Sequence, residues 1–206
     1  MNTGKVTGVI SNLIFIEANG AVTQNEICFI HAENKKLMAE VIKVEGSKIS
    51  AQLFEMSMTI KMGSQVDFTG KMLEIELGPG ILSKKYDGLQ NDLTKMSGLF
   101  IEIGQTSAAL DSDIYYKFTP ISKAGDTVQA GDWLGSVKEN WIDHKIMVPF
   151  ALKGTYTIES VVEEGDYLIH DIIAVLTSEN GEKTEVSMVQ KWAVKRTIDT
   201  YKQKIR

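Results

Sequence analysis

Length, composition and charge exclude several classes of protein. The chain has 206 residues, 43% of them hydrophobic, which is enough apolar material for a buried core and for one or two domains. A net charge of −5 argues against a nucleic-acid partner, because binding to phosphates requires a basic surface. The only cysteine, Cys28, lies in an apolar run, so the sequence excludes a disulfide framework and predicts a buried, inert thiol in a reducing cytoplasm.

The apolar segments are far shorter than a membrane span. The first residues lead directly into a strand-like alternation and not into the apolar region of a secretory signal. We therefore expect a soluble protein that is not exported.

Period-two patterns and glycine turns dominate the first part of the chain. The predicted strands cover residues 4–11, 13–16, 26–30, 37–44, 48–54 and 62–69, with tight turns at 18–20 and 45–47. Short strands joined by brief turns, without a long helical period, predict a small closed β-barrel, because closure removes exposed sheet edges. The expected fold class is mainly β, with a six-stranded barrel at the N-terminus.

The next segment changes character. Residues 72–77 read as one more strand, and Gly78-Pro79-Gly80 ends it. Residues 81–89 then predict a short helix, because five side chains would share one face: Ile81, Leu82, Lys85, Tyr86 and Leu89. This strand, turn and helix could be a joint between domains or an ordinary corner of the fold.

An internal repeat follows. Residues 124–137 are echoed by residues 164–176, and each half contains a turn, a short strand, a second turn and a hydrophobic strand. Gly-Asp pairs recur in both halves, because Gly reaches positive φ freely and Asp accepts hydrogen bonds from neighbouring backbone N–H groups. Two such halves predict a flattened β-sandwich with pseudo-twofold symmetry.

The sandwich pattern resembles the biotinyl/lipoyl carrier fold, in which a lysine at a hairpin between the halves holds a prosthetic group. The candidate attachment site is Lys145, within DHKIMVP at 143–149. Biotin sites usually read Met-Lys-Met, however, and Lys145 lies farther from Val137 than the carrier pattern allows. A solvated lysine on a strand is the competing interpretation.

Other patterns suggest ligand sites only superficially. Residues 63–72 resemble a phosphate loop, but the glycines are too far apart and Met72 replaces the hydroxyl that would hold magnesium. The turn 78–80 could cradle a phosphate, yet Pro79 removes one N–H donor. No G-x-x-x-x-G-K-[ST] motif is present.

Metal ligands are also not expected. Three histidines, His31, His144 and His170, lie far apart in sequence and lack ligand spacing. The stretch from Asp111 to Asp113 begins like a calcium loop but lacks the remaining ligands, which favours a helix cap or a turn. We therefore expect no catalytic, cofactor-binding or metal-binding residues in this chain.

An ordered series of motifs resembles the N-terminal portion of the catalytic A subunit (alpha chain) of V-type and archaeal-type rotary ATP synthases and ATPases. The motifs are TGKML at 69–73, ELGPGIL at 76–82, YDGLQ at 86–90, YKFTP at 116–120, GD at 125–126 and 131–132, HKIMVP at 144–149, EGDY at 164–167 and MVQKW at 188–192. The order of the series identifies the family, since no single motif is specific.

The resemblance implies four regions. Residues 1–70 would form the barrel, 71–110 the joint at the beginning of the nucleotide-binding domain with short α/β edges, 111–187 the bulge inserted into that domain, and 188–206 the return segment. The phosphate loop, with the ATP and Mg²⁺ that the parent subunit binds, would follow Arg206. The fragment alone would be inactive.

The resemblance also implies partners. The parent subunit couples ATP hydrolysis or synthesis to rotary transport of protons or sodium ions. The barrel would assemble with B subunits and other A subunits in a hexameric ring, and the bulge would contact the peripheral stalk. The headpiece is cytoplasmic and peripheral to the membrane, without membrane insertion or nucleic acid. The alternatives are a stand-alone carrier of the biotinyl/lipoyl type modified at Lys145, or a scaffold module without an enzyme parent.

Two corners depart from the family pattern. Asn91-Asp92 stands where the family commonly has Arg-Pro, and residues 192–195 read Trp-Ala-Val-Lys where it has Trp-Pro-Val-Arg. Loss of the prolines predicts looser corners and suggests a divergent bacterial branch of the family.

Overall fold

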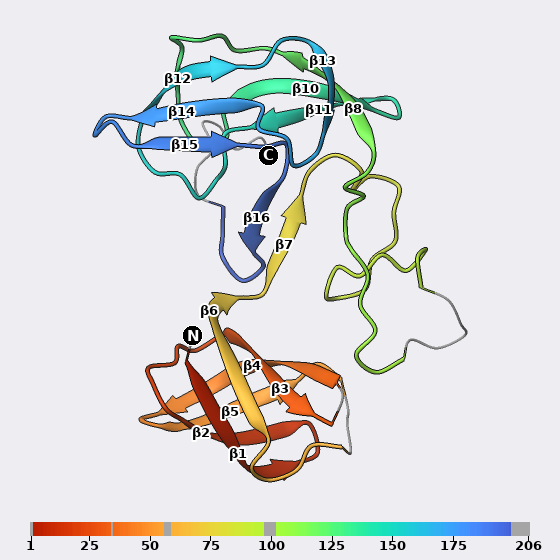
Figure 1. Ribbon diagram of the computed structural model, residues 1–206, viewed down its shortest axis with the longest axis vertical. Helices are drawn as coiled ribbons and strands as arrows, with labels where there is room; N and C mark the ends of the chain where they lie inside the picture. The colour runs from red at the N-terminus through yellow and green to blue at the C-terminus, as the bar shows by residue number, and fades with distance from the viewer. Residues whose placement is uncertain (1, 34, 56–58, 97–101, 199–206) are drawn as a thin grey trace. The chain divides into compact units, whose positions relative to one another are not determined.

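The computed structural model describes residues 2–33, 35–55, 59–96 and 102–198, and every regular element in these ranges is a β-strand (Figure 1). The chain divides into two compact units. Of the described residues, the first unit contains those up to Glu74 together with 96, 102–107 and 193–195, and the second contains 75–95, 108–192 and 196–198. The part of the predicted return segment from 199 to 206 lies outside the described residues. Within the described ranges, no helix is long and apolar enough to cross a membrane.

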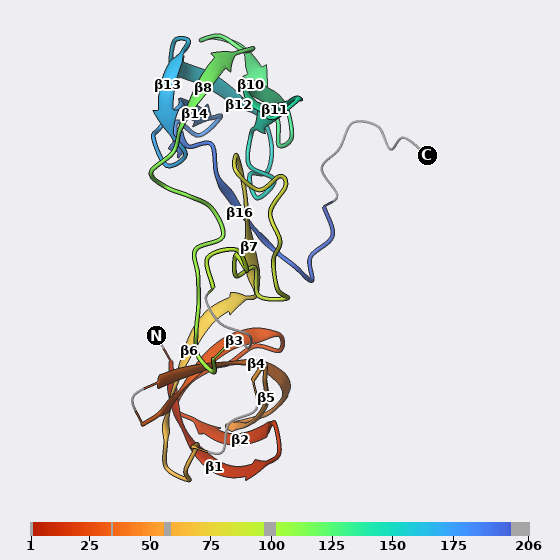
Figure 2. The same ribbon diagram turned by 90° about the vertical axis from the view of Figure 1, so that its right-hand side faces the viewer.

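The first unit is a closed barrel in the order β1-β2-β5-β4-β3-β6, visible as a ring of strands in Figure 2. Its strands are β1 (Thr3–Ile10), β2 (Leu13–Ala18), β3 (Glu26–Ala32), β4 (Lys35–Glu45), β5 (Lys48–Leu53) and β6 (Gln65–Met72). All six pairings are antiparallel, and β1 closes the ring by pairing with both β2 and β6. The predicted six-stranded barrel is confirmed.

The barrel core follows the period-two pattern of the strands, because alternate side chains point inward. The largest fully buried side chains of this unit are Ile14, Ile16, Ile30, Leu37, Ile49 and Phe68. Gly4 allows β1 to approach β2, since a Cβ atom there would lie 2.8 Å from the carbonyl oxygen of Glu17. Cys28 is completely buried as predicted, and burial, together with the nearby Glu26 carboxylate, raises the pKa of its thiol to about 12.

The second unit contains a sandwich of two four-stranded antiparallel sheets, ordered β11-β10-β8-β13 and β15-β14-β12-β9. Its strands are β8 (Tyr115–Pro120), β9 (Thr127–Val128), β10 (Trp133–Glu139), β11 (Ile142–Met147), β12 (Tyr156–Val161), β13 (Gly165–Leu168), β14 (Ala174–Ser178) and β15 (Lys183–Val186). The predicted β-sandwich is confirmed, and residues of both sheets form its core, which includes Phe118, Leu134, Ile158 and Leu176.

Two aspartates in the first half of the repeat accept backbone hydrogen bonds, as the sequence predicts. Asp126 accepts a hydrogen bond from the backbone N–H of Lys123 at 2.9 Å, and Asp132 accepts one from Gln129 at 2.8 Å. Gly135 has a different role, because a Cβ atom there would lie 2.2 Å from the ring of Phe118. The glycine therefore lets that buried ring cross β10.

A two-stranded sheet joins β7 (Glu74–Leu77) and β16 (Gln190–Ala193). The strand predicted at 72–77 is therefore divided, because β6 runs to Met72 and β7 begins at Glu74. Gly78-Pro79-Gly80 ends β7 in a turn, as predicted.

The prediction of a helix at residues 81–89 is wrong, because this segment consists of turns and one isolated bridge between Tyr86 and Asp92. The expected α/β edges therefore lack their helical part. Ser83 and Gln90 have φ values of 62° and 63°, which a right-handed helix does not allow. In addition, the Asp87 carboxylate accepts hydrogen bonds from the N–H groups of Leu89 and Asn91. This side chain competes with the helical hydrogen bonds that the apolar spacing favours.

Candidate functional site

The loop after β7 is held by polar side chains. Gln90 bonds to both backbone groups of Glu76, with its Oε1 2.7 Å from the Glu76 nitrogen and its Nε2 2.7 Å from the Glu76 oxygen. The amide thus substitutes for a neighbouring strand at this point of β7. The Tyr86 hydroxyl donates to the Ala109 carbonyl at 2.7 Å, which ties the middle of the loop to the segment before β8.

The corner at Asn91 and Asp92 is a buried polar cluster. Asn91 is 6% exposed and donates to the Asp87 carboxylate, whereas Asp92 is fully buried and lies 3.1 Å from the Lys84 ammonium. The hydroxyl of Thr94, helped by the Lys84 ammonium and against the effect of burial, holds the pKa of Asp92 below its usual value. Hydrogen bonds and an ion pair hold this corner, in contrast to the looser corner expected from the lost proline.

The second departure from the family pattern lies at the end of β16. Ala193 continues the strand, and the N–H of Val194 donates to the Leu73 carbonyl at 2.8 Å. Lys195 then forms an ion pair with Glu40 on β4 and donates to the Asn25 side chain. A backbone bond and a cation therefore fix the segment that follows Ala193.

The hairpin of β10 and β11 contains a buried carboxylate that the sequence analysis did not single out. Glu139 is 8% exposed, and one of its oxygens accepts a hydrogen bond from the Leu82 N–H at 2.8 Å. Its other oxygen lies 2.7 Å from Nδ1 of His144 on the partner strand. The alternation along β10 could have indicated this position, because Val137 and Glu139 share the inward face.

Lys145 lies within β11 and pairs with Ser136 in the hairpin, whose turn is at residues 140–141. Its ammonium lies 5.2 Å from the ring centroid of Trp133. The carrier hypothesis requires a lysine at the tip of a hairpin, so this placement removes its geometric basis. Lys145 is instead a strand lysine stacked on an exposed indole.

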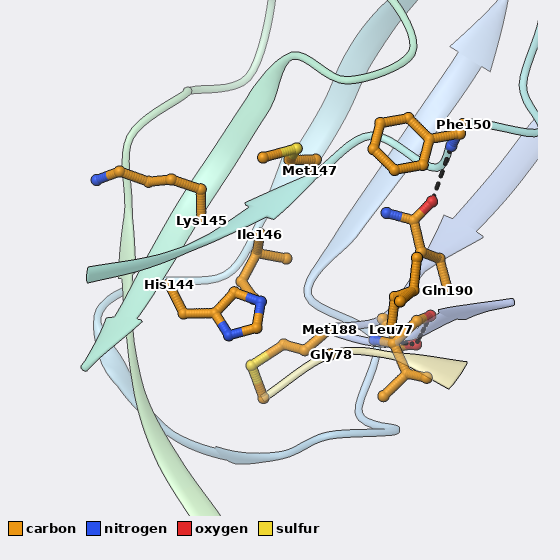
Figure 3. Close-up of a pocket in the computed structure, with 11 residues that line it drawn as sticks. Leu77, Gly78, His144, Lys145, Ile146, Met147, Phe150, Met188 and Gln190 are labelled. Carbon is orange, nitrogen blue, oxygen red and sulfur yellow. Dashed lines mark hydrogen bonds between the residues drawn. The ribbon is translucent and has the colours of Figure 1, made fainter. Parts of the chain in front are cut away.

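A cleft of about 140 Å³ lies beside β11 and the paired strands β7 and β16 (Figure 3). Its polar lining includes His144 and Gln190, and its apolar walls include Ile146, Phe150 and Met188. The cleft is lined by three of the family-like motifs, ELGPGIL, HKIMVP and MVQKW. Sequence reasoning grouped these motifs only by resemblance and did not place them around one cavity.

The structure separates the three histidines. His31 pairs with Asp67 of the barrel at 2.6 Å, a contact that lowers the pKa of this carboxyl group. His144 pairs with Glu139, and His170 is exposed. Among the described residues, no group of three or more His, Cys, Asp or Glu side chains could hold a metal ion.

The remaining patterns have structural explanations. In the stretch that resembles a phosphate loop, residues 65–72 form β6. In the turn 78–80, Gly80 packs against the Tyr116 hydroxyl, which would lie 2.6 Å from a Cβ atom at position 80. Asp111 and Asp113 lie at a turn, where the Asp113 N–H donates to the Asp111 carboxylate at 3.3 Å.

Comparison with known proteins identifies both units. Residues 6–70 match the family described as "ATP synthase alpha/beta family, beta-barrel domain", and residues 107–195 match "ATPsynthase alpha/beta subunit barrel-sandwich domain". Proteins named V-type ATP synthase alpha chain are 43% identical over 206 residues in Treponema denticola, 45% over 205 in Borrelia hermsii and 44% over 209 in Borreliella afzelii.

These alignments cover 98% to 100% of the chain and 35% to 36% of each relative. The chain therefore spans about a third of the length of the curated relatives it matches. Both the domain matches and the relatives show that the chain belongs to the ATP synthase alpha/beta family, among the V-type ATP synthase alpha chains.

Proposed function

We propose that the chain serves as the N-terminal part of a catalytic A subunit, whose full length couples ATP hydrolysis or synthesis to rotary transport of protons or sodium ions. The observation that carries the proposal is the alignment of almost the whole chain with relatives named V-type ATP synthase alpha chain. In this proposal ATP and Mg²⁺ bind to parts of the subunit beyond these residues, in a headpiece peripheral to the membrane.

The barrel contributes ring assembly in this proposal. Its surface exposes several large apolar side chains, among them Ile10 at 64% and Met62 at 75%. Binding to the barrels of B subunits and of other A subunits would cover such side chains.

The sandwich contributes the contact with peripheral-stalk subunits. Trp141, in the turn between β10 and β11, is 80% exposed, and Trp133 at the start of β10 is 51% exposed. Exposed indoles are characteristic anchors of protein interfaces.

Reconstitution tests these roles in two steps. The purified chain should show no ATP turnover, whereas the full-length subunit should show turnover once assembled with B subunits; turnover by the chain alone would contradict the proposal. In the full-length subunit, Ile10→Asp should weaken ring assembly and leave stalk binding intact. Trp141→Ala should have the opposite pattern, so each variant controls for the other. Equal effects of both variants on both readouts would contradict the assignment of roles.

A further inference from the structure

Three dipeptide steps of the chain are chemically reactive and have no part in the proposed assembly: Asn19-Gly20, Asp87-Gly88 and Asn180-Gly181. At such a step the backbone nitrogen of the glycine can attack the preceding side-chain carbonyl carbon, since no Cβ atom hinders its approach. The product is a five-membered succinimide ring, and no enzyme is needed. The surroundings of each step in the folded chain decide which one reacts.

The Asp87-Gly88 step is blocked by the hydrogen bonds of its carboxylate. One oxygen of Asp87 accepts from the N–H groups of Leu89 at 2.9 Å and Asn91 at 2.8 Å, and the other accepts from the Asn91 side-chain amide at 2.8 Å. Rotation of the carboxyl group toward the Gly88 nitrogen would break all three bonds. A carboxylate also resists attack, because its charge repels the nucleophile.

The Asn180-Gly181 step lies in the exposed turn between β14 and β15, where backbone bonds restrain it. The nitrogen of Gly181 donates to the Ser178 carbonyl at 2.9 Å. Ser178 and Glu182 close the turn, with the Ser178 N–H 2.9 Å from the Glu182 carbonyl and the Glu182 N–H 3.1 Å from the Ser178 hydroxyl. The attacking nitrogen must therefore leave its acceptor before it can react.

The Asn19-Gly20 step lacks this restraint. Both residues are exposed in the turn after β2, and the Gly20 N–H donates to no other residue in the part of the chain that the structure describes. The Asn19 side-chain amide lies 3.5 Å from the Thr3 hydroxyl, which is longer than an ordinary hydrogen bond. The backbone N–H of Asn19 donates to the Thr3 carbonyl at 2.8 Å, so the backbone is held while the side chain is free to rotate.

We propose that Asn19 is a site of spontaneous deamidation and isomerisation in the folded chain. Hydroxide removes the proton of the Gly20 nitrogen, which then forms a bond to Cγ of Asn19. The bond from Cγ to Nδ2 breaks, and the amide group takes up a proton from water and leaves as ammonia. Water next opens either carbonyl of the succinimide, which yields aspartate or isoaspartate. The net change is the gain of one water and the loss of one ammonia, without an oxidant or a reductant.

Isoaspartate at this position would alter the first residues of the barrel. Its main chain runs through Cβ and Cγ, so an additional carbon separates residue 19 from Gly20. The Asn2 side chain donates to the Ala21 carbonyl, and the Asn2 carbonyl accepts from the Phe68 N–H on β6 at 2.9 Å. Displacement of Ala21 should therefore speed hydrogen exchange of the Phe68 amide relative to Asn19→Asp, which has the ordinary backbone. Identical exchange in the two forms would contradict this consequence.

The two Asn-Gly steps provide an internal comparison, because trypsin places them on separate peptides, 6–35 and 154–183. The 206-residue chain is kept in mildly alkaline buffer, either folded or in concentrated guanidinium chloride, and conversion at each asparagine is measured by mass spectrometry. The quantity compared is the rate in the folded chain divided by the rate in denaturant. We expect this ratio to lie within about threefold of one at Asn19 and to be roughly tenfold lower at Asn180, whose glycine must break a hydrogen bond. Equal ratios, or a lower ratio at Asn19, would overturn the proposal.

A pair of variants, Asn19→Gln and Asn180→Gln, tests the source of the isoaspartate. Glutamine would have to close a six-membered ring, which forms far more slowly. Gly20 is left unaltered, because a Cβ atom there would lie 2.7 Å from the Asn2 side-chain oxygen. Isoaspartate in the folded chain, measured by enzymatic methylation, should fall roughly fivefold in Asn19→Gln and change little in Asn180→Gln. The reverse pattern, or an unaltered amount in Asn19→Gln, would refute the site.

Discussion

The side-chain amide of Gln90 pairs with both backbone groups of Glu76, at 2.7 Å in each direction. The backbone of Gln90 has a φ of 63°, in the left-handed region. Two hydrogen bonds, at a cost in backbone strain, thus anchor the loop to β7. The relationship explains why a glutamine suits this position of the YDGLQ motif, since only a primary amide donates and accepts in this geometry.

Gln90→Glu should destabilise the second unit. The carboxylate still accepts from the Glu76 N–H, but its other oxygen faces the Glu76 carbonyl, so one bond becomes a repulsion. We expect a loss of about 1–3 kcal/mol in the free energy of unfolding. All three tryptophans lie in the second unit, so tryptophan fluorescence during urea denaturation reports on this unit.

Gln129→Glu is the control for this change. The Gln129 side chain is exposed, and the same alteration there should change the free energy of unfolding by less than about 0.5 kcal/mol. Equal effects of the two variants would mean that the amide pair with Glu76 contributes nothing.

Periodicity predicted both the barrel and the sandwich, because inward and outward residues alternate along most strands. On β2, Ile14 and Ile16 are fully buried, whereas Glu17, the residue after Ile16, is exposed. The apolar and polar residue types alone indicate this pattern. Periodicity failed at residues 81–89, where apolar spacing favoured a helix. There the hydrogen bonds of the Asp87 carboxylate and two left-handed residues, Ser83 and Gln90, determine the backbone.

The candidate cleft could not be predicted from the sequence, for a different reason. Its polar groups, His144 and Gln190, are 46 positions apart in the printed sequence, and neither carries a local signature of binding. What distinguishes them is the partner that occupies one end of each side chain, Glu139 in one case and the Phe150 N–H in the other. Such partners depend on strand pairing and on the return of β16 to β7.

Glu139→Gln should loosen the contact between the β10–β11 hairpin and the loop. The amide oxygen can still accept from Leu82, but the charge-assisted bond with His144 is lost. We expect a loss of about 1–3 kcal/mol, measured by urea denaturation with tryptophan fluorescence.

Hydrogen exchange can locate this effect. The amide of Leu82 should exchange faster in Glu139→Gln, while amides of the barrel should remain unchanged. The control is Glu163→Gln, an exposed position in the same unit, which should leave Leu82 exchange as it is. Unaltered exchange at Leu82 in Glu139→Gln would contradict the assigned contact.

Cys28 provides a reporter for the first unit. With the thiol fully buried and its pKa raised to about 12, only about one molecule in ten thousand carries a thiolate near pH 8. A thiol reagent such as an aromatic disulfide should therefore react with the folded chain only through opening of the barrel. The rate should rise to that of a free thiol in concentrated urea. Rapid reaction of the folded chain, without loss of barrel structure, would contradict the burial of Cys28.

The pH dependence of the second unit should include a contribution from Asp92. The hydroxyl of Thr94 and the ammonium of Lys84 lower the pKa of this carboxyl group in the folded chain, so the unfolded chain binds the proton more readily. The stabilisation is therefore present above the ordinary carboxyl pKa and is lost as the pH falls through the lower pKa of the folded chain. Urea denaturation followed by tryptophan fluorescence, from about pH 6 down to about pH 3, should record this loss.

Asp92→Asn tests that assignment. The amide cannot form the ion pair with Lys84, so the variant should be less stable near neutral pH and should show a flatter decline of stability in acid. Asp113→Asn, at an exposed turn, should keep both the stability and the acid slope of the unaltered chain. If Asp92→Asn retained the full acid slope, the titration would have to be assigned to other carboxyl groups. The buried pair with Lys84 would then have no part in the pH dependence of this unit.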